Sequence, residues 1–186
     1  MKPKYLSFLL LANTIGFGVS PAIANPSNAS KLNFVCQVNN GVPTTIAQTP
    51  GGEHQLPIFH WREDILLNKT DASPQQLCND VTAKLEDYAA GGYDLSNISF
   101  IGTEQENIPV ICANNNLYAS GCSKMLLTLN KAQQPAIVAD QVVSGILNQN
   151  LLKNKVEAKG DRGVQSTSYQ VDFWSLLGLN FKLINK

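Results

Sequence analysis

Apolar and polar residues alternate over several short stretches of this chain, which is the pattern of half-buried β-strands. In the first stretch the apolar side chains would all fall on one face of a strand: Leu32, Phe34, Cys36 and Val38. The pattern predicts six strands, at residues 32–38, 44–47, 57–61, 98–101, 108–112 and 124–129. Because the turn-forming residues Gly41 and Pro43 separate the first two strands, we expect those strands to form a hairpin.

Two other stretches have apolar residues at helical spacing. The first follows Ser73-Pro74, a strong start signal because the serine hydroxyl can accept a first-turn N–H and proline has no N–H to satisfy. Gly91-Gly92 should end this helix, and a second helix should begin at Pro135. Together the pattern predicts a single α+β domain, in which an antiparallel sheet of about five or six strands packs against two helices.

The first 24 residues have the order of a secretory signal peptide. Two lysines precede an uncharged apolar run from Tyr5 to Val19, and small residues follow at Ala22 and Ala24. The run is about 15 residues long, whereas a membrane-spanning helix needs roughly 20. We therefore expect cleavage after Ala24 and export of the mature protein to the periplasm, the thylakoid lumen or the extracellular space.

The mature chain divides by composition into a folded domain, residues 25–148, and a C-terminal extension, residues 149–186. Residues 149–170 are polar and rich in lysine, which predicts a linker. Residues 173–181 form the most apolar stretch of the mature chain, and we expect them to dock on their own domain, on a partner or on a membrane surface. The candidate contact residues of this tail are Phe173, Trp174, Leu177 and Phe181.

All four cysteines lie in the mature region, and an even number in an exported chain favours two disulfides. A zinc site is the alternative, but its ligands usually come in close pairs, whereas these cysteines are 42, 34 and 10 residues apart. Three pairings are open to four cysteines. We favour Cys112–Cys122, which would close the loop between two predicted strands, and Cys36–Cys78, which would tie the first strand to the first helix.

Charge and motifs limit the function classes. Removing residues 1–24 leaves 12 of the 14 basic side chains against 14 acidic ones, a net charge of −2, with no run of lysine or arginine. A nucleic-acid binder is therefore not expected. No phosphate-binding glycine loop occurs, and we expect no cofactor. One titratable cluster could serve a small exported hydrolase, with His54, His60 and Asp64 as candidate residues, although its spacing fits neither a metal site nor a nucleophile motif.

A set of short segments carries a family resemblance. The segments are Phe34-Val35-Cys36, residues 41–47, residues 57–61, Ser73-Pro74 ahead of Cys78, Gly102, residues 107–112, and Gly121-Cys122 leading to residues 126–129. Together, over residues 33–148, they resemble the cyanobacterial circadian oscillating protein domain family. The resemblance implies an exported or membrane-associated protein, and it transfers no catalytic residue to this chain.

The sequence thus favours a non-enzymatic binding or interaction module whose partner is a protein or a membrane surface. Two alternatives stay open. One is the small hydrolase with its site near His54, His60 and Asp64. The other is an inhibitor that presents the loop closed by Cys112 and Cys122 to a target.

Overall fold

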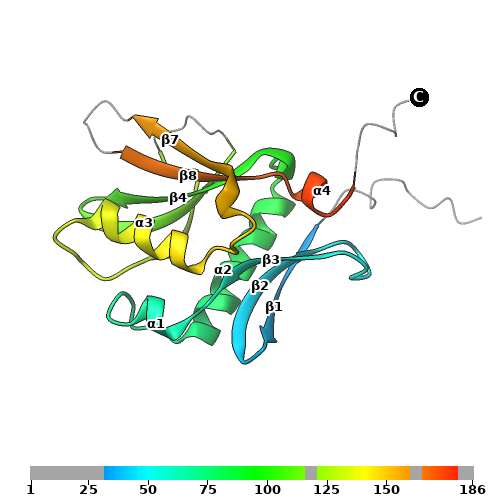
Figure 1. Ribbon diagram of the computed structural model, residues 1–186, viewed down its shortest axis with the longest axis horizontal. Coiled ribbons are helices and arrows are strands. Elements are labelled where there is room, and N and C mark those ends of the chain that lie inside the picture. The colour runs from blue at the N-terminus through cyan, green and yellow to red at the C-terminus, as the bar shows by residue number, and fades with distance from the viewer. Residues whose placement is uncertain (1–31, 116–120, 160–164, 180–186) are drawn as a thin grey trace, which may run out of the picture.

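The computed structural model describes residues 32–115, 121–159 and 165–179 of the 186-residue chain (Figure 1). Its strands, in chain order, are β1 (Asn33–Asn39), β2 (Val42–Gln48), β3 (Gln55–His60), β4 (Ile98–Gln105), β5 (Ile108–Asn114), β6 (Lys124–Thr128), β7 (Lys155–Lys159) and β8 (Gln165–Val171). Its two long helices are α2 (Pro74–Ala90) and α3 (Pro135–Ile146). Short helical turns are α1 (Glu63–Leu66), η2 (Leu95–Asn97), η3 (Leu152–Asn154) and α4 (Phe173–Leu176).

The strands form two antiparallel sheets, ordered β1-β2-β3 and β6-β5-β4-β8-β7. The α+β class with two main helices is confirmed, but the strands do not form the single sheet that we expected. After β3 the chain continues into α1 and α2 and returns as β4, which pairs with β5 and β8. The free edge of β3 instead meets the end of α3, where Phe59 bridges to Leu147 and the N–H of Asn148 donates to the carbonyl of Ile58 at 2.8 Å.

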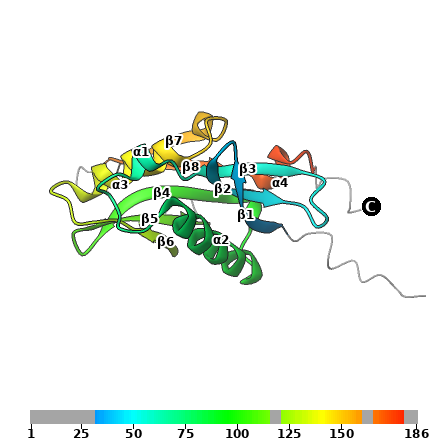
Figure 2. The same ribbon diagram turned by 90° about the horizontal axis from the view of Figure 1, so that it is seen from below.

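One hydrophobic core joins both sheets and both helices. Its buried residues include Phe34 of β1, Ile58 of β3, Leu85 of α2, Phe100 of β4 and Val143 of α3. Figure 1 shows α3 in front of β4, and Figure 2 shows α2 next to β5 and β6. Because α2 also packs on β1 and β2, it links the two sheets.

The predicted start of the first long helix is confirmed in detail. The hydroxyl of Ser73 accepts a hydrogen bond from the N–H of Gln76 at 3.2 Å, and Pro74 occupies the first helical position. The helix ends before Gly91, as expected. Its buried face lies at helical spacing and consists of Leu77, Cys78, Val81, Thr82, Leu85 and Tyr88.

Gly102 sets how closely α3 approaches β4. A Cβ atom at this position would lie 2.4 Å from the carbonyl carbon of Ala139 and 2.4 Å from the nitrogen of Asp140. Both atoms belong to the backbone of α3, so only a residue without a side chain allows the helix to pack this near the strand.

Residues 149–170 do not form the polar linker that their composition suggested. They include β7 and most of β8, and β8 pairs with β4 from Ile98↔Val171 to Ile101↔Ser168. Buried hydroxyl residues explain the misleading composition, because Thr167 and Ser168 are both buried within the sheet. The domain therefore extends well beyond residue 148.

The structure contains the two disulfides that we favoured. Cys36–Cys78 joins β1 to α2 with a Cα–Cα distance of 5.6 Å, and Cys112–Cys122 joins β5 to the segment before β6 with a Cα–Cα distance of 5.4 Å. Ile101, Val110 and Cys112 form a small second cluster with Cys122. Because Ile101 alternates with Phe100 along β4, this cluster lies on the face of the sheet opposite the main core.

Candidate functional site

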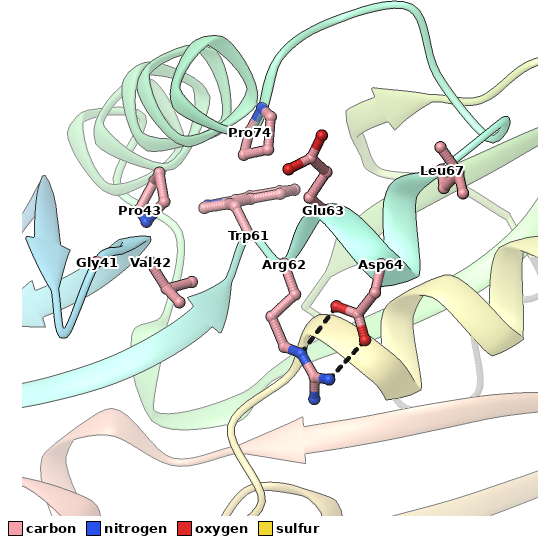
Figure 3. A pocket seen from close by; sticks show the side chains of 9 residues that line it. All are labelled: Gly41, Val42, Pro43, Trp61, Arg62, Glu63, Asp64, Leu67 and Pro74. Atoms are coloured by element: carbon pink, nitrogen blue, oxygen red, sulfur yellow. Dashed lines mark hydrogen bonds and ion pairs between the residues drawn. The ribbon is translucent and has the colours of Figure 1, made fainter.

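A hollow in the surface of the described residues lies where the β1–β2 turn faces α1 and the start of α2 (Figure 3). It has a volume of about 580 Å³ and is lined by Gly41, Val42, Pro43, Trp61, Arg62, Glu63, Asp64, Leu67 and Pro74. A second hollow of about 490 Å³ continues from it along the loop between α1 and α2. Glu63, Leu67 and Pro74 line both hollows, so we treat the two as one trough and call it the α1 groove.

Trp61 forms the fixed floor of the α1 groove. Its backbone N–H donates to the carbonyl of Pro43 at 2.9 Å, and its indole N–H donates to the hydroxyl of Thr45 at 2.9 Å. Figure 3 shows its ring between Pro43 and Pro74. Only 1 % of the Trp61 surface is exposed, so this residue shapes the groove but offers almost no area for stacking.

The outer wall of the groove is the turn that follows α1. Its backbone is fixed by Asn130, whose N–H donates to the carbonyl of Lys69 at 2.7 Å and whose amide donates to Asp71 at 3.2 Å. The side chain of Leu67 points away from the core and is 63 % exposed. Ile65, on the opposite side of α1, packs close to Gly145 of α3, and this contact holds the wall against the domain.

Carboxylates dominate the charge of the α1 groove. Its ionisable lining consists of Arg62, Glu63, Asp64 and Asp71. Arg62 is engaged by Asp64 through two hydrogen bonds, of 3.1 Å from Nε and 2.6 Å from Nη2. The positive charge of Arg62 therefore offsets the negative charge of Asp64. The carboxylates of Glu63 and Asp71 remain and give the groove a net negative charge.

His60, one of the candidate catalytic residues, is held by two hydrogen-bonding neighbours at the end of β3. Its Nδ1 lies 3.3 Å from the hydroxyl of Thr44, and its Nε2 lies 3.3 Å from the amide nitrogen of Asn148. The Thr44 hydroxyl already donates to the carbonyl of Val42, so it accepts from Nδ1–H, and Nε2 accepts from Asn148. Burial, and secondly the charge of Arg62, lowers the pKa of His60, in keeping with this neutral tautomer.

His54 and Asp64, the other two residues of the hypothetical hydrolase site, do not form a cluster with His60. His54 is exposed on the turn before β3, six positions earlier, which along an extended strand corresponds to roughly 20 Å. Asp64 is exposed on α1 and bound to Arg62. The structure therefore does not gather His54, His60 and Asp64 into one site.

The apolar tail is mostly part of the core rather than a contact surface. Phe173 is fully buried and meets Phe34 edge-on, with ring centroids 5.6 Å apart. Leu177 is also buried, and Trp174 packs against the core while partly exposed. The expected interaction surface is therefore wrong for Phe173 and Leu177. Phe181 lies outside the described residues.

The loop closed by Cys112 and Cys122 is described only in part, because residues 116–120 lie outside the described ranges. Asn114 holds its two ends together, with its amide donating to the carbonyl of Gly121 at 2.7 Å and its side-chain oxygen accepting from the N–H of Ser123 at 2.7 Å. These bonds order the ends of the loop, and an inhibitor role for the loop stays a prediction.

A half-buried acidic side chain between α3 and β8, that of Asp140, was not predicted from the sequence. Oδ1 of Asp140 is buried without a hydrogen-bond partner among the described residues. Burial raises the pKa of Asp140, while the charge of Lys155 and hydrogen bonds from Thr167 and Tyr169 act in the opposite direction. A single charged residue, Asp140, in an otherwise uncharged helix was the signal available in the sequence, but its partners come from a segment that was taken for a linker.

Within the ranges that the structure describes, no helix has both the length and the apolar character needed to cross a bilayer. Within the same ranges, no three His, Cys, Asp or Glu side chains are arranged to hold a metal ion.

One comparison with known proteins, that with family models, agrees with the family resemblance seen in the sequence. No curated protein matches the chain, and no solved structure matches it. A family model described as circadian oscillating protein COP23 matches residues 33–177, which reaches past residue 148 to include β8 and α4. Since this match covers most of the 186 residues, the chain belongs to the circadian oscillating protein COP23 family.

Proposed function

We propose that the mature chain is an exported, non-enzymatic binding module that engages its partner through the α1 groove. The observation that carries this proposal is the contrast between the fixed floor of the groove and its solvent-exposed apolar rim. Its floor, Trp61, is fixed by two hydrogen bonds to β2, while the apolar side chain of Leu67 is left open to solvent. A rigid base with exposed apolar side chains at its rim is typical of a surface that binds another molecule.

Export is supported by the two disulfides as well as by the N-terminal sequence. All four cysteines are paired, and such bonds persist in oxidising compartments and are rare in the cytosol. The periplasm, the thylakoid lumen and the extracellular space all meet this condition. Peripheral attachment to a membrane through the tail has less support than binding at the groove, because Phe173 and Leu177 are buried in the core.

Binding is favoured over hydrolysis because the candidate catalytic groups serve the fold. His60 is bonded to Thr44 and Asn148, and Asp64 is bonded to Arg62. A general base must reach the proton that it removes, and neither group has, among the residues that the structure describes, a neighbour that would activate it for this role. Hydrolysis of a model ester, peptide or glycoside that is abolished by His60→Gln would overturn the proposal.

The proposal is tested by site-specific photo-crosslinking in the native host. A benzophenone amino acid replaces Leu67, and the control places it at Ile137 of α3, which is also exposed and lies outside the groove. We expect an adduct with a second molecule from position 67 and none from position 137. No adduct from position 67, or equal adducts from both, would contradict the groove as the binding surface.

The unmodified protein, recovered from the same host, tests export. Intact mass spectrometry without reduction should give residues 25–186 less four hydrogens. A full-length chain with free thiols would contradict export, and the cysteines would then have to be explained by metal or redox chemistry.

A further inference from the structure

The shape of the α1 groove favours an extended ligand. Its two hollows, of about 580 and 490 Å³, share Glu63, Leu67 and Pro74, so that they follow one another along the surface. Small-molecule sites usually enclose most of their ligand's surface. This trough is open along its length, and an extended peptide segment can lie in such a trough with successive side chains on alternate sides.

The apolar lining of the groove comes from rigid positions. Pro43 and Pro74 flank the buried ring of Trp61, and neither proline loses backbone freedom on binding (Figure 3). Leu67, at the other end of the hollow, is 63 % exposed. These side chains offer anchors for apolar residues of a ligand.

The charge of the groove selects among possible ligands. Three carboxylates line it against one guanidinium, which is bound to Asp64. Among the residues that the structure describes, Glu63 has no ion-pair partner, and Asp71 is bonded only to the neutral amide of Asn130. Lys69 belongs to the same turn but does not line either hollow. An anionic lipid surface or a nucleic acid would be repelled, whereas lysine or arginine would be attracted.

We infer that the α1 groove binds an extended segment of a partner protein that carries lysine or arginine beside apolar residues. The apolar residues of that segment lie against Pro43, Pro74 and Leu67, and its cationic groups lie near Glu63 and Asp71. This inference rests on the proposed binding function and specifies the chemistry of its partner.

The test selects heptapeptides from a random phage-displayed library on the oxidised mature protein. We expect the selected peptides to be enriched in lysine or arginine next to apolar residues. Their dissociation constants are then measured by fluorescence anisotropy. Raising the ionic strength from about 0.05 to about 0.5 M should weaken binding, because the groove charges are exposed and therefore screened.

Two groove variants and two matched controls locate the bound peptide. Leu67→Gln, which removes the apolar contact without adding charge, and Glu63→Lys should each weaken binding by about tenfold or more, which corresponds to losing one well-placed contact. Ile137→Gln and Asp80→Lys make the corresponding changes at exposed positions outside the groove and should alter binding by less than about twofold. Circular dichroism of each variant confirms that it is folded.

The outcomes separate this inference from the proposed function. Basic peptides that lose affinity in both groove variants support the inference. Acidic or uncharged peptides that bind in the groove would overturn the inference and leave the proposed function intact. Peptides that bind every variant equally would contradict both the proposed function and the inference, because both place binding in the groove. An absence of selected peptides would overturn the inference. Binding of phosphatidylglycerol vesicles that Leu67→Gln abolishes would replace a protein partner with a membrane.

Discussion

The indole N–H of Trp61 donates a 2.9 Å hydrogen bond to the hydroxyl of Thr45, and both residues are buried. The same hydroxyl oxygen accepts from Thr82 of α2 at 3.2 Å. A single oxygen therefore connects the floor of the α1 groove, the central strand of the small sheet and the first long helix. This connection explains how a groove at the edge of the domain can have a rigid base.

Replacing Thr45 by valine should destabilise the protein by about 1–3 kcal/mol, because the buried indole N–H would lose its acceptor. Thr82→Val is the matched control. It removes a donor to the same oxygen but leaves the indole bonded, so its cost should be below about 1 kcal/mol. Urea unfolding followed by tryptophan fluorescence measures both. Equal losses in the two variants would mean that the indole bond does not determine the stability of this site.

The two disulfides should contribute unequally to stability. In the loop-entropy model, a bond between residues 42 apart stabilises by about 4 kcal/mol and one between residues 10 apart by about 3 kcal/mol. The double variant Cys36→Ala/Cys78→Ala should therefore unfold at lower urea concentration than Cys112→Ala/Cys122→Ala. The reverse order would show that the contacts around Cys112 contribute more than loop closure does.

The approach of α3 to β4 should not tolerate a side chain at position 102. Gly102→Ala places a methyl group 2.4 Å from two backbone atoms of α3, and overpacking of this kind typically costs 1–3 kcal/mol or more. Gly121→Ala is the control, because its Cβ would have no atom within 4 Å. A thermal unfolding midpoint that falls only for Gly102→Ala is the expected result. An unchanged midpoint would mean that α3 can move away without loss of packing.

The elements with a strong local signal were predictable from the sequence. The helix start at Ser73-Pro74 and the strand around Phe34 needed only spacing and one capping residue. Strand β8 was not predictable in this way, because Thr167, Ser168 and Tyr169 are all buried and the polar–apolar alternation disappears. A strand buried on both faces with hydroxyl side chains has the composition of a linker.

The α1 groove was also beyond the reach of local patterns. Its lining comes from three separate segments: the turn at Gly41, the stretch from Trp61 to Pro74 at the start of α2, and Asn130. Nothing in the sequence shows that these segments meet. The sequence did single out the stretch from His60 to Asp64, but it suggested acid–base chemistry there rather than a binding surface.

Stability should rise with pH over the range in which His60 titrates. Burial, followed by the charge of Arg62, lowers the pKa of His60 below its ordinary value of 6.5. As the pH falls below 6.5, the unfolded chain therefore takes up a proton that the folded protein does not, and the free energy of unfolding decreases. Comparing urea unfolding at pH 7.5 with that at pH 5.5, about one unit on either side of the ordinary pKa, measures the effect.

His60→Gln is the control for this pH dependence. Glutamine keeps hydrogen-bonding groups but does not titrate, so the variant should lose the part of the pH dependence that His60 causes. Other groups, Asp140 among them, act equally in both proteins and cancel in the comparison. The same pH dependence in both proteins would contradict the lowered pKa of His60.

The last prediction decides whether the C-terminal tail belongs to the core or to a contact surface. Phe173→Ala should destabilise the domain by about 3–5 kcal/mol, the usual cost of removing a buried aromatic ring. Leu176→Ala on the same short helix changes a side chain that is 40 % exposed and should cost less than about 1 kcal/mol. Urea unfolding compares the two. The opposite result would be that both variants keep full stability but are lost from the membrane fraction in which the wild-type protein is found. The tail would then act outside the domain, and the functional conformation would not have Phe173 buried against Phe34.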